Sequence, residues 1–401
     1  MGQGLTCKKP KVAIIGAGPA GCMCGITISK DCDVNFFEMA KPLKTLLATG
    51  GGRCNLAHAE YDFKELAKYY PRGEKFLYSI FSRFSTQDTL DFFEKIGIRT
   101  YAQSDGRIFP VSNSALEIRE KMLAQLKNAR FIKEKVIDVK KIDEHFYITT
   151  ENNKYLFDIV VIATGTHLGL QFLKKLPHKV HELKPSLCGL VTKNDFSTLK
   201  GVVLNDIIIK YNKIVLEGDM LFTDNGVSGP IIFKLSSINS RVGYPYEIKI
   251  KFIPNKIDLE KLLKLNNNRT LKNALSNVLP KSFVKYILNF LKIDETLKIN
   301  CTTNNTRELL LKSLNSFSVT VISARKGGET VFSGGISLSE IGSNLESKLV
   351  ENLYFCGEIL DIDGFCGGFN LQNCWSTGYL AGCSILETMY GHGFARYKDF
   401  S

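Results

Sequence analysis

Four polar side chains in two short motifs could surround a reactive group. Arg53, Cys54 and Asn55 directly follow three glycines, and Arg107 stands in the turn Ser104-Asp-Gly-Arg-Ile-Phe-Pro. Three successive glycines are costly in ordered backbone, because glycine loses more conformational freedom on folding than any other residue. We therefore expect this loop to run beside a flat, polar ligand, with a flexible loop as the alternative. Spacing alone assigns no acid or base, so these four residues are the catalytic candidates.

A second set of residues could hold a dinucleotide. The apolar run that starts at Lys11 breaks into Gly16-x-Gly18-x-x-Gly21 and continues into a helical pattern. In a strand, turn and helix unit, the first glycine lets the backbone reverse, the second lets it approach a pyrophosphate, and the third lets the helix pack closely. Free N–H groups at the helix start attract the phosphates. Glu38, 22 residues after Gly16, has about the spacing of a carboxylate that accepts ribose hydroxyls.

A third set lies near the end of the chain. The turn Gly357-Glu358-x-x-Asp361 follows a buried strand and could accept hydrogen bonds from a ribityl chain. Gly367-Gly368 then opens a helix whose positive end could favour an anionic reduced flavin, and Arg53 would add to that effect. The glycine turn alone does not distinguish NAD from FAD. The triple-glycine loop and this acidic segment favour FAD, because they provide walls for a ribityl chain and a flavin.

Hydrophobic periodicity indicates which elements position these residues. Residues 60–100 and 114–128 have helical spacing, and the apolar strand 157–163 ends in Thr164-Gly165, which returns the chain to the first sheet. From 186 to 253 the residues alternate as strands. We therefore predict an α/β fold with one inserted region. The predicted domains are an FAD-binding domain of residues 1–185 and 345–401, a β-rich inserted domain of 186–256 and 316–344, and a helical lobe of 257–315.

Composition narrows the function classes. The 401 residues are 44% hydrophobic, and 52 basic against 40 acidic residues give a net charge of +12 without any block of like charges. A solvated basic surface is therefore favoured over contact with nucleic acid. No apolar run is long enough to cross a membrane, and the N-terminus lacks a signal peptide's apolar core, so we expect a cytoplasmic protein.

The cysteines and histidines do not indicate a metal site. The eleven cysteines contain no Cys-x-x-Cys pair and are typical of reduced cytosolic thiols. His178 and His181 could share a helix face, but no cysteine or acid partner stands nearby, and we expect them on the surface. We therefore predict that the protein binds no metal.

Seven motifs, in this order, resemble one known family. They are Gly-Ala-Gly-Pro-Ala-Gly, Gly-Gly-Gly-Arg-Cys-Asn, Gly-Arg-Ile-Phe-Pro, Leu-Phe-Thr-x-x-Gly-Val-Ser-Gly-Pro, Ser-Gly-Gly-Ile, Gly-Glu-Ile-Leu-Asp and Gly-Gly-Phe-Asn-Leu-Gln. From about residue 11 to 385 the chain is similar to the BaiN/YhiN-like FAD-dependent oxidoreductases, also called the aminoacetone oxidase family. The resemblance implies a two-part Rossmann-type FAD-binding domain, like that of glutathione reductase, interrupted by a β-rich domain and a small helical domain.

The resemblance also implies which residues bind FAD, from the pyrophosphate through the ribose to the ribityl chain and ring. They are Gly16, Gly18, Pro19, Ala20, Gly21, Glu38, Gly51, Gly52, Arg53, Cys54, Asn55, Val136, Ala163, Thr164, Gly165, Gly357, Glu358, Asp361, Gly367, Gly368, Phe369, Asn370, Leu371 and Gln372.

This chain departs from the family pattern at several positions. Thr45 replaces the usual lysine before two leucines, and Leu56-Ala57-His58 stands where Leu-Thr-Asn is usual. The usual Pro-Thr-Gly-Gly-Tyr-Asn is Phe365-Cys-Gly-Gly-Phe-Asn370, and the glycine-rich stretch after Ala-Thr-Gly is shortened to 164–168. We expect FAD binding to survive these differences, which bear instead on contacts with the substrate and a partner cofactor.

The first functional hypothesis is an FAD-dependent oxidoreductase that passes a hydride from NAD(P)H to a small organic acceptor or to oxygen. The sequence has no second Gly-x-Gly-x-x-Gly motif, so NAD(P)H would bind only transiently. One alternative is an RNA-modifying flavoprotein, suggested by the net charge and the lysine-rich insert. The other is a redox sensor or scaffold that uses Cys54 and Cys366 without turnover, although both are more simply small packing residues. The expected partner is a small-molecule substrate, and the oligomeric state stays open.

Overall fold

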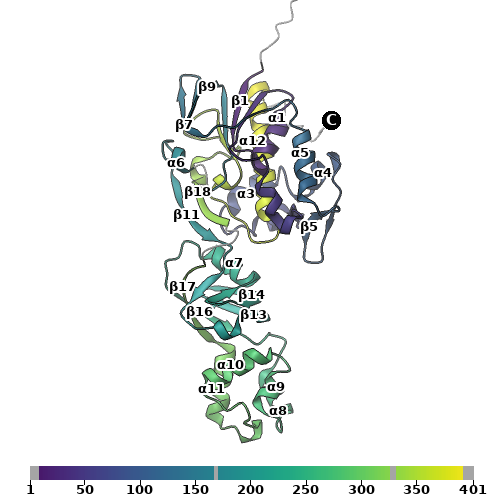
Figure 1. Cartoon of the computed structure of the whole chain (residues 1–401), viewed down its shortest axis with the longest axis vertical. Helices are drawn as coiled ribbons and strands as arrows, with labels where there is room; N and C mark the ends of the chain where they lie inside the picture. The colour runs from purple at the N-terminus through teal and green to yellow at the C-terminus, as the bar shows by residue number, and fades with distance from the viewer. Residues whose placement is uncertain (1–8, 167–169, 326–330, 392–401) are drawn as a thin grey trace, which may run out of the picture. The chain divides into compact units, whose positions relative to one another are not determined.

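The computed structural model describes residues 9–166, 170–325 and 331–391, and it divides the chain into two compact units. The first unit combines Met1–Leu183 with Phe332–Ser401, and the second is Lys184–Val331. Figure 1 shows the chain coloured from purple at the N-terminus to yellow at the C-terminus.

A five-stranded parallel sheet forms the centre of the first unit. Its strand order is β19-β10-β1-β2-β6. The strands are β1 (Lys11–Ile15), β2 (Asp33–Phe37), β6 (Arg130–Ile132), β10 (Ile159–Ile162) and β19 (Leu353–Phe355). Apart from the exposed Lys11, the residues of β1 and β10 are apolar and buried, because helices and other elements cover both faces of a parallel sheet. In this sheet β10 pairs with β1, and β19 pairs with β10. These pairings confirm the prediction that strand 157–163 and the last part of the chain return to the first sheet.

Two helices from opposite ends of the sequence pack on this sheet. The first is α1 (Pro19–Ile28), and the second is the long helix α12 (Phe369–Tyr390), which lies beside it in yellow in Figure 1. They approach closely because α12 has glycines at the contact. A Cβ at Gly378 would lie 2.3 Å from the carbonyl oxygen of Ala20, and one at Gly382 would lie 2.6 Å from Cβ of Thr27. No larger residue fits at either position without movement of the backbone or the helix.

Shorter elements complete the first unit. Its other helices are α2 (Phe63–Ala67), α3 (Glu74–Phe81), α4 (Thr86–Lys95), α5 (Ala115–Ala124) and α6 (Leu170–Leu173). It also has three smaller sheets. One contains β3 (Ala57–His58), β5 (Arg107–Pro110) and β4 (Thr100–Ala102), and another contains β7 (Val136–Ile142), β8 (His145–Thr150) and β9 (Lys154–Phe157). The third is the pair of β11 (Val180–Ser186) and β18 (Val331–Ile336). The helical segments predicted over 60–100 and 114–128 are present, and the second is shorter than expected.

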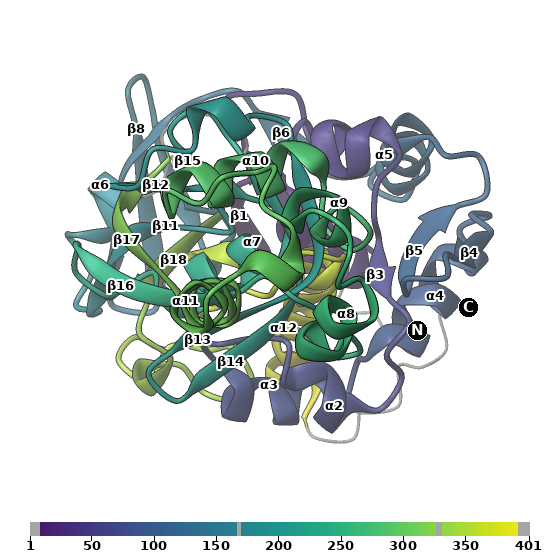
Figure 2. The ribbon, with the colours of Figure 1, turned by 90° about the horizontal axis from the view of Figure 1, so that it is seen from below.

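The second unit is a closed barrel with a group of helices. The barrel order is β12-β15-β14-β13-β16-β17, closed by pairing of β12 with β17. Its strands are β12 (Leu190–Thr192), β13 (Val203–Tyr211), β14 (Ile214–Phe222), β15 (Gly226–Ser228), β16 (Tyr246–Lys251) and β17 (Phe317–Ala324). The helices are α7 (Pro230–Ile238), α8 (Leu259–Leu265), α9 (Leu271–Leu275), α10 (Lys281–Phe290) and α11 (Asn304–Asn315). Figure 2, seen from below, shows α8 to α11 in front of the barrel strands.

The prediction of strands throughout 186–253 was wrong at α7. Pro230 occupies the first turn of this helix, where its missing N–H costs no hydrogen bond, and Gly229 adopts a left-handed φ of +98°. The helix buries Ile231, Ile232 and Leu235. The alternation of apolar residues in the preceding strands masked this helical spacing.

The helices of 257–315 share one hydrophobic core with the barrel. Phe283 of α10 contacts Phe222 of β14, with ring centroids 5.8 Å apart, and Phe252, with centroids 4.7 Å apart. The chain re-enters the first unit at Phe332, earlier than the predicted boundary at 345. A physical reason is the tight packing of β18: a Cβ at Gly334 would lie 2.5 Å from the carbonyl oxygen of Glu182.

A buried ion pair fixes the segment before α12. The guanidinium of Arg72 donates from Nε and Nη2 to the two carboxylate oxygens of Asp363, in a two-pronged arrangement. The side chains are 13% and 1% exposed, and the two backbones also form an isolated β-bridge. Removal of one partner of such a pair leaves a buried charge without compensation.

We predict that Arg72→Ala lowers the free energy of unfolding by about 3 kcal/mol, because it strands the Asp363 carboxylate. Urea unfolding monitored by circular dichroism measures the loss. Lys68→Ala is the matched control, since Lys68 forms an exposed pair with Glu65, and no measurable change is expected. Equal effects of the two substitutions would contradict a special role for the buried pair.

Candidate cofactor site

The glycine turn contains two glycines that the protein itself requires and one that it does not. A Cβ at Gly16, where φ is +106°, would lie 2.4 Å from the carbonyl oxygen of Ala163. A Cβ at Gly21 would lie 2.1 Å from the carbonyl oxygen of Gly16. At Gly18, φ is −79° and no atom lies within 4 Å of the Cβ position. The open space at Gly18 is therefore left for something other than the chain.

Glu38 is held beside this turn. It follows β2, and its Oε2 accepts a hydrogen bond from the backbone N–H of Ala17 at 2.9 Å. Its other oxygen, Oε1, accepts from the N–H of Ala40 at 2.8 Å. These two bonds fix the carboxylate at the carboxyl end of the parallel strands, where ligands bind in open α/β sheets.

A cavity of about 460 Å³ opens over the turn. It is lined by Gly16, Ala17, Gly18, Pro19, Ala20, Glu38, Ala40, Lys41, Leu43, Lys44, Thr45, Ala48, Ala163, Thr164, Gly165, Thr166, Gly357, Glu358 and Cys374. A second cavity of about 120 Å³ adjoins Glu38 and includes Val136 and Thr164. The fold thus brings together predicted cofactor residues from three separate parts of the chain.

Sequence reasoning missed two basic groups in the larger cavity. Lys41 and Lys44 are exposed and line it together with the glycine turn. Their ammonium groups would add to the positive end of α1 in attracting a pyrophosphate. The sequence could have indicated these two lysines, because both lie within six residues after Glu38, the candidate for the ribose contact.

The triple-glycine loop is ordered by left-handed backbone at three successive positions. The φ angles of Gly50, Gly51 and Gly52 are +59°, +68° and +86°. A Cβ at Gly50 would lie 2.9 Å from the backbone nitrogen of Asn55, whereas no atom lies within 4 Å of the Cβ position at Gly51. The loop is exposed on its outer side. Three successive positive φ angles suit glycine, and the role of this loop as a wall of the cofactor site stays a prediction.

The two arginine candidates lie on one aromatic ring. The guanidinium carbon of Arg53 lies 4.2 Å from the centroid of Phe109, and that of Arg107 lies 5.7 Å from it. Arg107 also pairs with Asp105 at 2.7 Å. Two guanidinium groups that are 54 residues apart in the sequence therefore lie over the same ring.

Cys54 and Asn55 point into the protein. Cys54 is buried, and burial raises the pKa of its thiol to about 12, so the thiol stays protonated at neutral pH. The Asn55 amide, oriented to satisfy its neighbours, donates to the carbonyl of Ala57 at 3.0 Å and accepts from the N–H of Gly368 at 3.0 Å. Asn55 thus joins the triple-glycine segment to the start of α12.

The acidic segment lies against the cavity at Gly357 and Glu358. Glu358 lines it, and burial together with the negative charge of Asp363 raises the pKa of this carboxyl. Asp361 is buried, and its carboxylate lies 3.8 Å from Nε2 of His181. His181 belongs to β11, and His178 is only 6% exposed and bonded to Ser347. The expectation of a shared helix face, with both histidines on the surface, was therefore wrong.

The polar residues at the start of α12 form internal hydrogen bonds. The Asn370 side chain bonds both the N–H of Gly364 (2.8 Å) and its carbonyl (3.1 Å). The buried Gln372 donates to the hydroxyls of Thr89 (2.8 Å) and Ser376 (2.9 Å). Neither these residues nor Gly367, Phe369 and Leu371 line the described cavities. The backbone and orientation of this segment are therefore held by its own side chains.

An aromatic stack follows the double glycine. Phe369 packs against both His58 and Tyr69, with ring centroids at 4.6 Å and 4.3 Å, and the rings of His58 and Tyr69 are themselves 5.7 Å apart. Nδ1 of His58 is 3.1 Å from the carbonyl oxygen of Gly367. Two departures from the family pattern, at His58 and Phe369, thus contact one another. This contact could not be predicted from the sequence, because the two residues are far apart along the chain.

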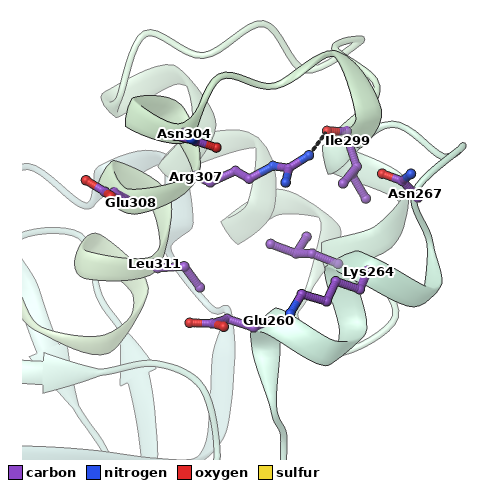
Figure 3. Close-up of a pocket in the computed structure, with 9 residues that line it drawn as sticks. Glu260, Lys264, Asn267, Ile299, Asn304, Arg307, Glu308 and Leu311 are labelled. Atoms are coloured by element: carbon purple, nitrogen blue, oxygen red, sulfur yellow. Dashed lines mark hydrogen bonds between the residues drawn. The ribbon is translucent and has the colours of Figure 1, made fainter.

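Another cavity, of about 410 Å³, lies on the helices of the second unit (Figure 3). It is lined by Glu260, Leu263, Lys264, Asn267, Ile299, Asn304, Arg307, Glu308 and Leu311. Arg307 is anchored there by the carbonyl of Ile299 at 2.9 Å. No predicted site residue contributes to it, and its two acids balance its two bases.

Within residues 9–166, 170–325 and 331–391, no three His, Cys, Asp or Glu side chains come close enough to hold a metal ion. None of the described helices is both long and apolar enough to cross a membrane.

The first unit fits FAD by its own geometry. The Cβ position at Gly18 is open, a cavity covers the turn, and the carboxylate of Glu38, the candidate for the ribose contact, is fixed beside it. The N–H groups at the start of α1 would hold the pyrophosphate.

Comparisons with known proteins show what the chain is similar to. A family model described as an HI0933-like protein Rossmann domain matches residues 10–384. A 3-dehydro-bile acid delta(4,6)-reductase of Clostridium scindens is 26% identical, over 94% of this chain and 99% of its own length. A ribosomal RNA dihydrouridine synthase of Escherichia coli is 28% identical, over 93% and 97%. Among solved structures, a flavocytochrome c3 fumarate reductase matches with a TM-score of 0.48 and 14% identity, over 96% of this chain and 79% of that one.

We predict that Gly18→Ala weakens FAD binding about ten-fold and leaves the unfolding of the apoprotein unchanged. Its φ suits alanine and its Cβ meets only the cavity, where it would obstruct a pyrophosphate. FAD titration by fluorescence quenching and urea unfolding measure the two effects. Gly16→Ala is the contrasting variant and should lose stability, because its Cβ meets Ala163. Unchanged FAD affinity in Gly18→Ala would exclude the proposed cradle.

The raised pKa of Glu358 makes a prediction about pH. Ionisation of this carboxyl is harder in the folded apoprotein than in the unfolded chain, so stability falls as pH rises from about 4.5 through the raised pKa. We expect Glu358→Gln to lack this loss and to gain on the wild type as pH increases from 4 to 7. Urea unfolding of both apoproteins across that range provides the test, with the exposed Glu94→Gln as control. Parallel pH profiles would argue against the raised pKa.

Proposed function

The chain belongs to the HI0933-like family of FAD-dependent oxidoreductases, and from that premise we propose that it reduces a carbon–carbon double bond conjugated to a carbonyl. The hydride would come from NAD(P)H by way of FAD. It would reach the β-carbon of the acceptor, and a proton would reach the α-carbon. NAD(P)⁺ and a saturated carbonyl compound would be the products, which balances the reaction.

The names of two relatives support this reaction class. A delta(4,6)-reductase acting on a 3-dehydro bile acid removes double bonds conjugated to a ketone. A dihydrouridine synthase saturates the C5–C6 bond of uracil, which is conjugated to the C4 carbonyl. Both acceptors accumulate enolate-like negative charge when a hydride adds. The two names therefore share one specific reaction, the reduction of a carbon–carbon double bond conjugated to a carbonyl.

The observation that carries the proposal is the open cradle at Gly18, with its cavity of about 460 Å³. When bound there, FAD supplies hydride transfer. The α1 N–H groups would bind its pyrophosphate, Lys41 and Lys44 would add positive charge, and Glu38 would accept the ribose hydroxyls.

Arg53 and Arg107 would serve the acceptor. Both are partly exposed and both lie over Phe109 at the triple-glycine wall. A guanidinium at this wall would stabilise the negative charge on the carbonyl oxygen of the acceptor as the hydride adds. Cys54 is less suited to the reaction, because its buried thiol has a pKa of about 12. The same burial weakens the alternative of a redox sensor based on Cys54.

The first acceptor we propose is a small enone. A uridine in ribosomal RNA is the second candidate, and one observation favours it. Residues 184–331 contain 22 basic and 12 acidic residues, a net charge of +10, whereas the rest of the chain contains 30 and 28. An RNA substrate would account for basic charge gathered in one unit.

We expect the FAD-loaded protein to bleach anaerobically with NADPH or NADH, and the reduced flavin to be reoxidised by cyclohex-2-enone. Cyclohexanone is the matched control, because it has the carbonyl without the double bond, and it should not reoxidise the flavin. Stopped-flow absorbance near 450 nm follows both steps, with roughly ten-fold slower reoxidation expected for Arg53→Gln. Bleaching without reoxidation by the enone or by a uridine-containing RNA would refute the proposed reaction.

A further inference from the structure

Positive charge is concentrated in the second unit of the chain. The cofactor-binding unit has a net charge of only +2, from 30 basic and 28 acidic residues, although it contains more residues. The second unit has +10. A charge imbalance of this size raises the free energy of the folded unit through self-repulsion, and a polyanionic partner would relieve it.

Helix α10 presents a basic face with no acid on it. Its inner side buries Phe283, Val284, Ile287 and Leu288 in the core shared with the barrel. Its outer side exposes Lys281, Ser282, Lys285, Asn289 and Phe290. Lys281 and Lys285 are four residues apart and therefore lie on the same side of the helix. No residue of α10 is acidic.

A loop of the barrel that packs against this helix carries two more lysines. The hydroxyl of Tyr286 donates to the carbonyl of Asp195 at 3.0 Å, and the rings of Tyr286 and Phe196 lie 5.8 Å apart. The same loop exposes Lys193 and Lys200. Asp195 is its one acid, and hydrogen bonds from Ser197 lower the pKa of that carboxyl, so it is ionised at neutral pH.

The four lysines Lys193, Lys200, Lys281 and Lys285 are called the α10 lysine face below. Among the described residues, none of these ammonium groups has a carboxylate within 4.0 Å. Some other lysines of the second unit are paired, as Lys256 is with Asp206 and Lys272 is with Glu295. The positive charge of the α10 lysine face is therefore available to a ligand.

Two aromatic side chains lie on the same helix as Lys281 and Lys285. Tyr286 and Phe290 stack with ring centroids 6.2 Å apart, and Phe290 is 54% exposed. Lysines that track a backbone, next to an aromatic ring on which a base can stack, are the combination that binds single-stranded nucleic acid.

We propose that the α10 lysine face, with Phe290, binds single-stranded RNA. This inference rests on the RNA branch of the proposed function and names the surface that would recognise such a substrate. A membrane is a poorer occupant, because the outer side of α10 has Phe290 as its one large apolar residue and lacks an apolar face to insert. The nearby cavity of Figure 3 is a poorer anion site, because Glu260 and Glu308 offset Lys264 and Arg307.

The test uses the full-length FAD-loaded protein and a fluorescein-labelled, uridine-rich 20-nucleotide RNA of low structure. Fluorescence anisotropy gives the dissociation constant between 50 and 200 mM KCl. We expect Lys281→Glu/Lys285→Glu to bind at least about ten-fold more weakly and to lower the slope of log K against log salt by about 1.4, for two lost phosphate contacts. Phe290→Ala should weaken binding without changing the salt slope.

The matched control is Lys127→Glu/Lys174→Glu, which makes the same change in net charge at exposed lysines of the other unit. It should leave RNA affinity within about two-fold of the wild type, since long-range effects are screened at this ionic strength. Equal losses in the two double variants would overturn the inference in favour of a general charge effect. Absence of RNA binding by the wild type would overturn it as well, as would preferential binding to vesicles containing phosphatidylserine.

Reduction of cyclohex-2-enone separates this inference from the proposed function. Both double variants should reduce the enone at the wild-type rate, because neither alters the cofactor-binding unit's cavity. A protein that binds RNA through the α10 lysine face but reduces neither the enone nor uridine would refute the reaction and leave the surface assignment standing. A protein that reduces the enone but does not bind RNA would do the reverse.

Discussion

The site depends on backbone packed directly against backbone at positions without side chains. Gly16 lies against Ala163, Gly21 lies against Gly16, and Gly378 of α12 lies against Ala20 of α1. Each contact is too close for a Cβ, so each sets the distance between elements to a value that no other residue permits. Together they place the start of α1, the end of β10 and the side of α12 around one space. The cavity is the space left between these three closely packed backbone segments.

Side-chain hydrogen bonds then connect the remaining wall to this frame. Asn55 bonds the N–H of Gly368, His58 approaches the carbonyl of Gly367, and the indole of Trp375 donates to the carbonyl of Leu56 at 3.0 Å. All three bonds join residues 55–58 to the start of α12, more than 300 positions later. Because each satisfies a polar group that is at least partly buried, loss of one would both loosen the wall and leave an unpaired donor or acceptor. This explains why Asn55 and Trp375 serve the wall without lining the cavity.

The sequence was sufficient for the parts of the site that depend on local backbone chemistry. Gly16-x-Gly18-x-x-Gly21, the acid at Glu38 and the strand ending at Thr164 each have a meaning that is fixed within a few residues. It was insufficient where the meaning depends on distant partners. Nothing near His58 in the sequence indicates that it stacks on Phe369, and nothing near Asn55 indicates that its amide is used by Gly368. The helix α7 was hidden for a related reason, since Gly229-Pro230 starts it inside a region of alternating strands.

Charge separates the two units as clearly as their folds do. A flavin site gains from a nearly neutral surrounding, because a few placed cations such as Arg53, Lys41 and Lys44 then set the local potential without competition from distant charge. A surface that recognises a polyanion gains from the opposite, since its affinity grows with the number of cations that can reach phosphates. The two demands are therefore more easily met when the net charge lies in a unit other than the one that holds the cofactor site. An insertion that carries most of the net charge in a separate barrel and helices resolves the conflict, and it lets the recognition surface change without disturbing the glycine contacts on which the cofactor site depends.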